Sequence, residues 1–282
     1  MNVGQWQLDT VSGGRFWIDG GTMFGVVPRV AWARHAPPDE NNRIEIATNC
    51  VLARNGDHTV LIDTGYRGHA TEQEREVLSL EEGQPLVENL ARLDVGVEQI
   101  TLVVLSHLHF DHAGGAVQAE QAGGYRPTFP NARYVVQRQE WDDAMSQAAE
   151  LRGAYFAKKL SPLAEHNVLD LLEGDVEIVP GLSTIVTGGH TRGHQALAFE
   201  SRGETAIYPA DVCPTTAHVR QLWCTSYDTD PLETRRCKPG LLGRAADEGW
   251  WILWDHDPQC AASRVARDDR REFRIVDAQQ QL

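Results

Sequence analysis

One stretch of ten residues, "SHLHFDHAGG" at positions 106–115, constrains this chain more than any other. It places His107, His109, Asp111 and His112 within six positions, directly after the apolar run "TLVVL". Imidazoles and carboxylates are costly to bury together unless they share a partner. In an extended or turn backbone, residues i and i+2 point the same way, so His107 and His109 can reach one metal ion. Imidazole and carboxylate are the usual ligands of zinc, so the stretch predicts a metal site where a strand ends.

Three more polar residues occupy similar positions farther along the chain. His190 follows two glycines in "TGGHTRGH", and these glycines allow a tight backbone turn. Asp211 ends the strand-like run "ETAIYPAD", and His256 lies near the end of "WWILWDHD". Strand ends are where a rigid scaffold presents functional groups on loops. We therefore take His190, Asp211 and His256 as candidates for further ligands.

The apolar pattern predicts sheets with helices on their outer faces. Strands are predicted over 46–55, 58–65, 100–107, 132–137, 194–201 and 204–211, with two more over 176–190 and a last one over 250–257. Helices are predicted over 85–95 and 138–150, whereas 231–249 is predicted to be helical in pieces because Pro239 interrupts it. The stretch 21–43 is a long irregular segment, which is typical of a lid or binding loop.

Composition narrows the classes of partner and compartment. The chain has 282 residues and a net charge of −14, so it would repel a polyanion, and nucleic acid is not an expected partner. No apolar run approaches the ~18 residues of a membrane span, so no membrane partner is expected. The five cysteines show no CxxC spacing and no signal segment opens the chain, which favours free thiols in the cytoplasm.

The order His107-x-His109-x-Asp111-His112, then His190, Asp211 and His256, resembles the metallo-β-lactamase superfamily. The resemblance covers nearly the whole chain, and "VLIDTG" at 60–65 precedes the histidine motif as it does in that family. It implies an α/β fold, the αββα four-layer sandwich, with the metal site at one edge of the two sheets. It also implies one domain over 1–282, with 21–43 as a lid-like loop.

The resemblance further implies a ligand set. One zinc ion would bind His107, His109 and His190, a second would bind Asp111, His112 and His256, and Asp211 would bridge them together with a hydroxide. Two zinc ions per chain are expected, with iron or manganese as alternatives. Asp63 would orient the site from behind the ligands, or would only end a strand in a turn. His194 is expected to be a structural hydrogen-bonding residue rather than a ligand.

Within the superfamily, "SHLHFDHAGG" with "TGGHTRGHQALAF" is most similar to N-acyl homoserine lactonases and methyl-parathion-hydrolase-like enzymes. The similarity implies hydrolysis of a small molecule, in which the bridging hydroxide attacks a lactone or ester carbonyl, with N-acyl homoserine lactones (quorum quenching) the leading candidate. The alternatives are a phosphotriesterase or phosphodiesterase, a glyoxalase II-like thioesterase, and less favoured, a mononuclear iron persulfide dioxygenase or a non-catalytic binding protein. Enzymes of this kind are often dimers, so a homodimer is the expectation.

The sequence departs from the lactonase pattern at one place. The best-known lactonases have a tyrosine just after the bridging aspartate, whereas here Asp211 is followed by "VCPTTAH". Beside Asp111 and Asp211, the candidate catalytic residues are therefore His218 and Tyr227. For the substrate pocket the candidates are apolar residues of the lid-like loop and one aromatic residue beyond it: Met23, Phe24, Val26, Trp32 and Trp223. The alternative for these side chains is packing beneath a loop. Trp250 and Trp254 alternate along a predicted strand and are expected to face the core.

Overall fold

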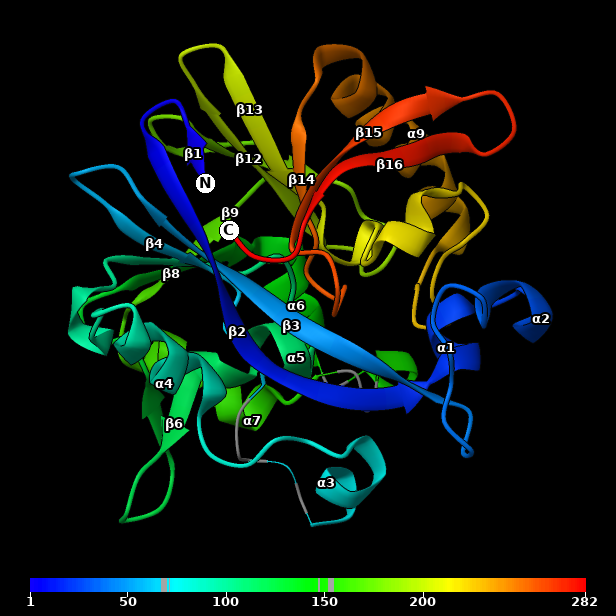
Figure 1. The fold of residues 1–282 in the computed structure, drawn as a ribbon. Helices are drawn as coiled ribbons and strands as arrows, with labels where there is room; N and C mark the ends of the chain where they lie inside the picture. Colours follow the sequence, from blue (N-terminus) through cyan, green and yellow to red (C-terminus); the bar gives the residue numbers. More distant parts are fainter. Residues whose placement is uncertain (67–69, 71, 147, 152–154) are drawn as a thin grey trace.

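A computed structural model describes residues 1–66, 70, 72–146, 148–151 and 155–282 (Figure 1). In this part of the chain the strands form two seven-stranded sheets and a two-stranded ribbon. Each large sheet takes its strands from one half of the sequence. The first has the order β1 (Asn2–Val3), β2 (Trp6–Asp19), β3 (Arg43–Arg54), β4 (Thr59–Ile62), β5 (Leu102–Val104), β8 (Arg133–Gln137), β9 (Leu169–Leu172). The second has the order β10 (Glu177–Val179), β11 (Leu182–Val186), β12 (Gln195–Ser201), β13 (Glu204–Tyr208), β14 (Trp251–Leu253), β15 (Ala262–Asp268), β16 (Glu272–Gln279). The ribbon pairs β6 (Val117–Ala119) with β7 (Tyr125–Pro127).

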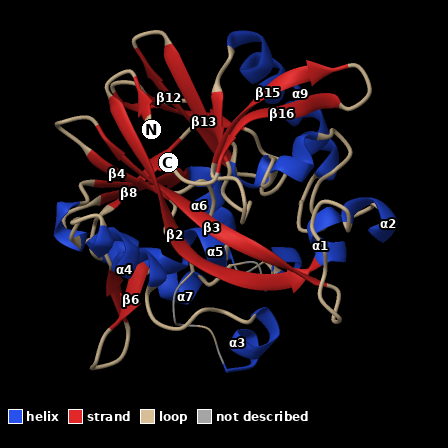
Figure 2. Ribbon diagram, viewed as in Figure 1, coloured by secondary structure: helices blue, strands red, loops and turns tan. Residues whose placement is uncertain are grey.

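Helices lie outside both sheets, as Figure 2 shows in blue. The α-helices of the described residues are α1 (Gly20–Phe24), α2 (Arg29–Trp32), α3 (Glu72–Leu78), α4 (Pro85–Arg92), α5 (Phe110–Ala113), α6 (Arg138–Ser146), α7 (Ala157–Leu160), α8 (Pro162–Glu165) and α9 (Pro231–Glu248). Short 3₁₀ turns accompany them, including Ala210–Val212 and Thr216–Val219. Over the described residues, none of these helices is both long and apolar enough to span a membrane.

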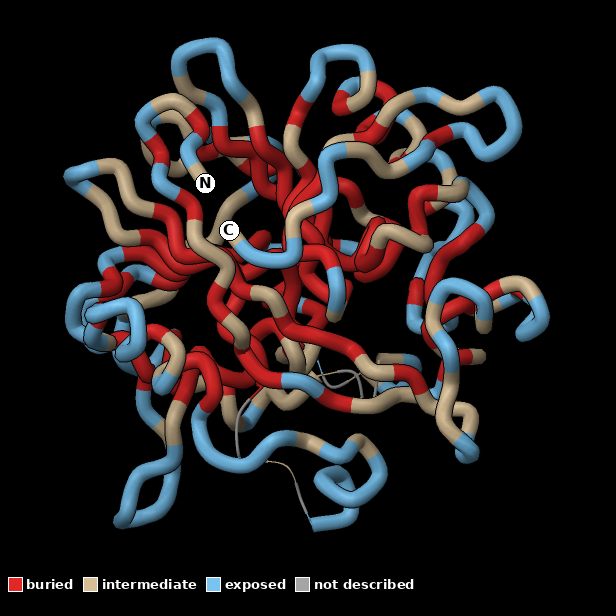
Figure 3. The backbone as a smooth tube through the Cα atoms, viewed as in Figure 1, coloured by how far each residue is buried: buried red, intermediate tan, exposed pale blue. Residues whose placement is uncertain are grey.

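Three apolar clusters separate the layers of the fold. One joins the first sheet to α4, α6, α7 and α8, as Leu90 and Trp141 meet Val103. Another lies between the sheets and contains Val51 and Phe199. A third joins the second sheet to α9 through Leu242. Figure 3 shows buried backbone running through the centre of the molecule and exposed backbone at the loop tips. The predicted αββα arrangement is confirmed.

The long hairpin of β2 and β3 was not fully predicted, because β2 lies in a segment that the apolar pattern did not mark. Its alternation is broken at Gly13 and Gly14, where the register with β3 shifts between Ser12 and Arg15. Gly14 has φ +114°, and a Cβ there would lie 2.5 Å from the ring of Tyr66. On either side of this bulge the strand is buried in different clusters, Trp6 and Leu8 between the two sheets and Phe16 in the cluster that also contains Phe24 and Trp32.

The prediction that 231–249 is helical in pieces is wrong, because α9 runs unbroken through Pro239. Asp230 caps the first turn by accepting from the N–H groups of Leu232 and Glu233, and Gly249 ends the helix in the left-handed region. Proline removes the hydrogen bond to the carbonyl four residues earlier. That carbonyl belongs to Arg235, and it accepts instead from the side-chain amide of Gln221 at 3.0 Å.

The prediction that 250–257 holds the last strand is also wrong. The hairpin of β15 and β16 follows and forms the edge of the second sheet. Val265 and Phe273 are buried against the α9 side of the sheet, while charged residues surround the turn between the two strands. That charge hid the alternation in the sequence. Trp250 and Trp254 do face the core, as predicted.

Candidate metal centre

The site is built where strands of both sheets end. β4 and β5 are parallel neighbours, so Asp63 and the loop that carries His107 emerge at the same edge of the first sheet. β13 and β14 are parallel neighbours in the second sheet, and they bring Asp211 and His256 to that sheet's edge. His109 precedes α5, whose first turn carries Asp111 and His112. His190 lies in the turn between β11 and β12.

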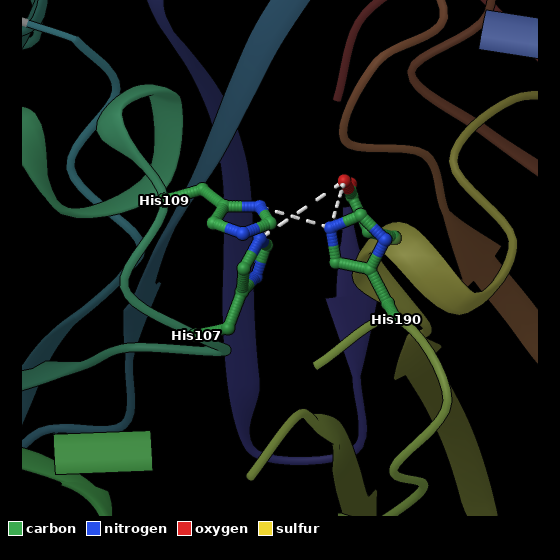
Figure 4. A group of neighbouring side chains, drawn as sticks. His107, His109 and His190 are labelled. Atoms are coloured by element: carbon green, nitrogen blue, oxygen red, sulfur yellow. Dashed lines mark hydrogen bonds and ion pairs between the residues drawn. The ribbon is translucent and has the colours of Figure 1, made fainter. Parts of the chain in front are cut away.

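The first cluster comprises His107, His109, His190 and Asp211, whose ligand atoms all lie within 4.8 Å of one another. His190 Nε2 lies 3.0 Å from His109 Nδ1 and 2.9 Å from Asp211 Oδ2. His107 Nε2 is 4.0 Å from the same carboxylate oxygen. Figure 4 shows the three imidazoles converging, with His107 and His109 on one side and His190 on the other.

The second cluster comprises His112, Asp211, Asp255 and His256, again within 4.8 Å of one another. His112 Nε2 and His256 Nε2 are 3.1 Å apart, and they lie 3.3 Å and 3.0 Å from Asp211 Oδ1. Asp111 Oδ2 is 3.5 Å from His256 Nε2, so Asp111 faces this cluster. Asp211 thus offers one oxygen to each cluster, which is the arrangement expected of a bridging ligand.

Hydrogen bonds behind the rings decide which nitrogen carries a proton. His112 Nδ1 lies 2.8 Å from Asp63 Oδ2, His190 Nδ1 lies 2.9 Å from Asp228 Oδ1, and His256 Nδ1 lies 2.7 Å from the carbonyl of Ala47. Since those partners accept, each Nδ1 donates, and in the neutral ring, the form that binds metal, Nε2 keeps a lone pair that faces the cluster. The lone pairs of His112 Nε2 and His256 Nε2 face each other at 3.1 Å and repel unless a cation lies between them, so the donor set fits a metal ion at the second cluster.

Two buried atoms support the same fit. Among the described residues, His107 Nε2 and Asp211 Oδ1 are buried and have no hydrogen-bond partner. Burial, followed by the neighbouring histidines, holds the pKa of His107 and of His109 well below the ordinary value. Both rings are therefore neutral at pH 7, the form that binds metal.

Near His190 the neighbouring carboxylates have the opposite effect on the pKa of the ring. Burial lowers the pKa of His190, but Asp211 and Asp228 outweigh it and raise the pKa to about 10. Burial raises the pKa of Asp211, but His190, His256 and His112 outweigh it and hold that pKa well below the ordinary value. The site therefore favours a positive charge among these groups, and a divalent ion supplies one.

Asp63 lies directly behind the second cluster. Besides its contact with His112, it accepts from the N–H and the hydroxyl of Ser106, each at 2.7 Å, and from the hydroxyl of Tyr208 at 3.0 Å. Its φ of +56° also places it in a tight turn after β4. Asp63 therefore lies behind a candidate ligand and also ends a strand in a turn.

His194 lies beside the ligands without joining them. Its Nε2 accepts from the N–H of Asp211 at 3.1 Å, and its Nδ1 lies 2.6 Å from the hydroxyl of Thr187. With both nitrogens engaged, the ring fixes the backbone of Asp211, in line with the structural role expected of it. Gly193 is required nearby, because a Cβ there would lie 2.3 Å from the backbone nitrogen of Glu140.

Sequence reasoning missed three residues at the site. Asp228 binds His190 from 38 positions away, a separation that carries no local signal. Glu140 is fully buried and joins the two histidine loops, since it accepts from the N–H of Leu108 at 2.9 Å and from the hydroxyl of Thr191 at 2.6 Å. Asp255 belongs to the second cluster, and its place beside His256 in "WDHD" was the available signal.

The two candidate catalytic residues, His218 and Tyr227, lie in different environments. His218 is fully buried, stacks on Phe24 at 4.8 Å between ring centroids, and contacts the carbonyl of Met23 and the hydroxyl of Thr215. It is a core residue there, away from the cavity described next, in contrast to the prediction. Tyr227 is 51% exposed and lines that cavity.

A cavity of about 360 Å³ opens over both clusters. Its described wall includes both apolar side chains and metal-ligand candidates. The lining residues are Phe16, Ile18, Met23, Ile46, Glu74, Leu78, His109, Phe110, Asp111, Glu150, Leu151, Tyr155, His190, Asp211, Thr225, Tyr227, Thr229 and His256.

The predicted pocket residues divide into three groups. Met23 lines the cavity over the clusters, and with Phe24 it also lines a second cavity of about 550 Å³. Trp32 and Trp223 are buried in a cluster beneath α1 and α2, so packing under the loop describes them. Val26, predicted to line the pocket, is 74% exposed and is not among the residues that line either cavity. The segment 21–43 is also less irregular than expected, because it contains most of α1 and all of α2.

Comparison with known proteins agrees with this geometry. An N-acyl homoserine lactonase of Bacillus cereus is 29% identical over 170 residues, which are 57% of this chain and 61% of the relative. The chain thus matches about three-fifths of the length of the first curated relatives. A probable metal-dependent hydrolase from Staphylococcus aureus has 31% identity and a TM-score of 0.89, covering 98% of this chain and 99% of that one. A dizinc quorum-quenching lactonase, solved with an acyl-homoserine product, has 22% identity and a TM-score of 0.79, covering 98% and 95%, and shares the fold.

The family assignment rests on the match to a family model, together with the order of the predicted ligands. Residues 43–255 match the model of the metallo-beta-lactamase superfamily, a span that includes β3 to β14 and every predicted ligand except His256. The chain is a member of the metallo-β-lactamase superfamily.

Proposed function

We propose that this protein is a dinuclear zinc hydrolase that opens a lactone or ester, with N-acyl homoserine lactones as the leading substrate class. The observation that carries the proposal is the shared carboxylate of Asp211, which faces the first cluster with Oδ2 and the second with Oδ1. His107, His109 and His190 would hold one ion, and Asp111, His112 and His256 the other. Two zinc ions held in this way supply a nucleophile from water near neutral pH and polarise a carbonyl oxygen.

The protein itself binds and orients the substrate. Phe16, Ile18 and Leu78 offer apolar surface for an acyl chain in the same cavity that the candidate ligands line. Tyr227 lines that cavity with a side chain that is half exposed, so its hydroxyl is available to a substrate carbonyl. We assign Tyr227 the role that the tyrosine after the bridging aspartate has in the best-known lactonases.

The charge of the wall favours a neutral substrate. Glu74 and Glu150 line the cavity, and among its described lining residues there is no lysine or arginine. Glu74 and Glu150 would oppose the parts of an anionic phosphodiester or glutathione thioester that extend beyond the two metal ions. A lactone, a neutral ester or a neutral phosphotriester would not be opposed in this way, so the phosphotriesterase is the alternative that this observation leaves in place.

The test is pH-stat measurement of acid release by the zinc-loaded protein. The substrates are short-chain and long-chain N-acyl homoserine lactones, a matched aliphatic ester and a neutral phosphotriester. We expect metal-dependent lactone opening with kcat/KM of about 10⁴ M⁻¹s⁻¹ or more, rising with acyl length until the cavity is full. The matched control is His109→Ala, which removes a predicted ligand.

Two results would contradict the proposal. Full activity in a metal-depleted His109→Ala protein would remove the metal from the mechanism. Turnover of the phosphotriester with none of the lactone or the ester would move the function to phosphotriester hydrolysis.

A further inference from the structure

Asp255 sits in a rigid stretch of backbone at the end of β14. Its carbonyl accepts from the N–H of Asn49 at 2.7 Å, and the side-chain amide of Asn49 donates to the carbonyls of Trp254 and Asp257. The N–H of His256 donates to the carbonyl of Pro214 at 3.1 Å. The backbone on both sides of Asp255 is therefore fixed, and its side chain is directed into the protein, where it is 1% exposed.

The carboxylate of Asp255 is buried beside the second cluster. Among the described residues, both of its oxygens are buried without a hydrogen-bond partner. A neighbouring aspartate shows the contrast. Asp257 accepts from the N–H and hydroxyl of Thr216 and from the N–H groups of Gln259 and Cys260. A buried carboxylate without such partners is costly unless it is protonated or a cation meets it.

The groups that surround Asp255 are ligand atoms. Its oxygen lies within 4.8 Å of the ligand atoms of His112, Asp211 and His256, and Oδ2 is 3.6 Å from His256 Nε2. Asp255 also faces the carboxylate of Asp211. Four atoms spaced in this way can contact one ion at ligand distances of about 2.0–2.6 Å.

We propose that Asp255 is itself a metal ligand, which adds a carboxylate to the second cluster beyond the ligands predicted from the motif. The assignment rests on the metal centre of the proposed function. With Asp255 as a ligand, the two metal positions would have different ligand sets. The first has three imidazoles and Asp211, whereas the second has two imidazoles and the carboxylates of Asp111, Asp211 and Asp255.

The test compares Asp255→Asn with the wild type in two measurements that a purely structural residue would not move in this combination. In calorimetric zinc titrations of the metal-depleted proteins, we expect two sites in the wild type. In the variant, the affinity of one site should fall by more than about 100-fold while the other is unchanged, a larger loss than a residue that only orients a ligand gives. In chelator, the variant should melt at or above the wild-type temperature, because asparagine removes a buried charge and loses no hydrogen bond.

Asp257→Asn is the matched control, since it changes a buried aspartate two residues away. It should melt earlier in chelator, because it weakens four hydrogen bonds, and it should keep two zinc sites of wild-type affinity. Asp255→Ser is the second variant and gives the same readout if Asp255→Asn does not fold.

The outcomes separate this assignment from the proposed function. If Asp255→Asn and Asp255→Ser both keep two zinc sites of wild-type affinity, Asp255 is not a ligand, and the dinuclear hydrolase stands. If the wild type binds only one ion or none, the dinuclear centre and the role of Asp255 fail together.

Discussion

At the scale of one residue, exposure distinguishes the two candidate catalytic residues, Tyr227 and His218. Of the two candidates for the missing lactonase tyrosine, only Tyr227 reaches the described cavity, while both ring nitrogens of His218 are engaged in the core. Both residues are plausible from residue type alone, because burial cannot be read from a short loop sequence. The ligands were easier to predict because metal chemistry demands several particular side chains at once.

Replacing Tyr227 with phenylalanine tests its assigned role. If the hydroxyl donates to the carbonyl oxygen as charge develops there, kcat for lactone opening should fall by about 100-fold, with little change in KM. Steady-state kinetics on one N-acyl homoserine lactone give both constants, and metal analysis should show an unchanged zinc content. A fall in zinc content, or a kcat equal to that of the wild type, would rule out this role.

The burial of His218 predicts that the free energy of unfolding falls in acid. Burial, followed by the positive charge of Lys238, lowers its pKa from 6.5 to about 3. The unfolded chain therefore takes up a proton on His218 below pH 6.5, whereas the folded chain does not until about pH 3. The stabilisation by neutral His218 is complete above pH 6.5 and is lost as the pH falls toward 3, by about 2 kcal/mol at pH 5.

Urea unfolding in chelator at pH 7 and pH 5 checks this prediction. His218→Gln should be less stable than the wild type at pH 7, but its difference between the two pH values should be smaller by about 2 kcal/mol. His166→Gln, at an exposed position, should keep the wild-type difference. An unchanged difference in His218→Gln would show that the ring is not kept neutral by the fold.

At the scale of elements, local pattern predicted what local forces determine. The β3–β4 hairpin around Asn55-Gly56 and helix α4 were predictable, because alternation and helical spacing are visible in short windows. The continuity of α9 was not, because the carbonyl that Pro239 leaves unpaired is satisfied by Gln221, which lies before the helix in sequence. The hairpin of β15 and β16 was hidden by its charged turn, and β2 by its glycine bulge.

Helix α9 gives a prediction about capping. Asp230 Oδ1 accepts from the N–H of Leu232 at 3.1 Å and from that of Glu233 at 3.0 Å. Asp230→Ala should lower the free energy of unfolding by about 1 kcal/mol, measured by urea unfolding in chelator. Asp230→Asn should recover most of the loss, because an amide oxygen can still accept. Equal losses in both variants would show that the negative charge, not the cap, is what matters.

At the scale of the whole molecule, the ligands tie the sheets together. His107, His109, Asp111 and His112 follow the first sheet's β5, and His190, Asp211 and His256 belong to the second sheet's loops. Ions bound there stabilise only the folded state, by about 2.7 kcal/mol for each site at a free concentration 100 times Kd.

Metal removal should therefore destabilise the whole protein. Thermal unfolding of the wild type should shift to lower temperature in chelator and recover when zinc is added back. Asp211→Asn should lose most of this response, since Asp211 belongs to both clusters, whereas His109→Ala should retain part of it. The same metal response in Asp211→Asn and the wild type would place the stabilising ions elsewhere.

The division of the sheets along the chain has a consequence for how the centre can be taken apart. Every strand of the first sheet lies between residues 2 and 172, and every strand of the second lies between 177 and 279. The exposed turn at Glu173 and Gly174 joins them. A chain cut at this turn would yield two fragments, each with part of the donor set and neither with a whole cluster. We therefore expect the two fragments to reassociate when zinc is present and to separate when it is chelated.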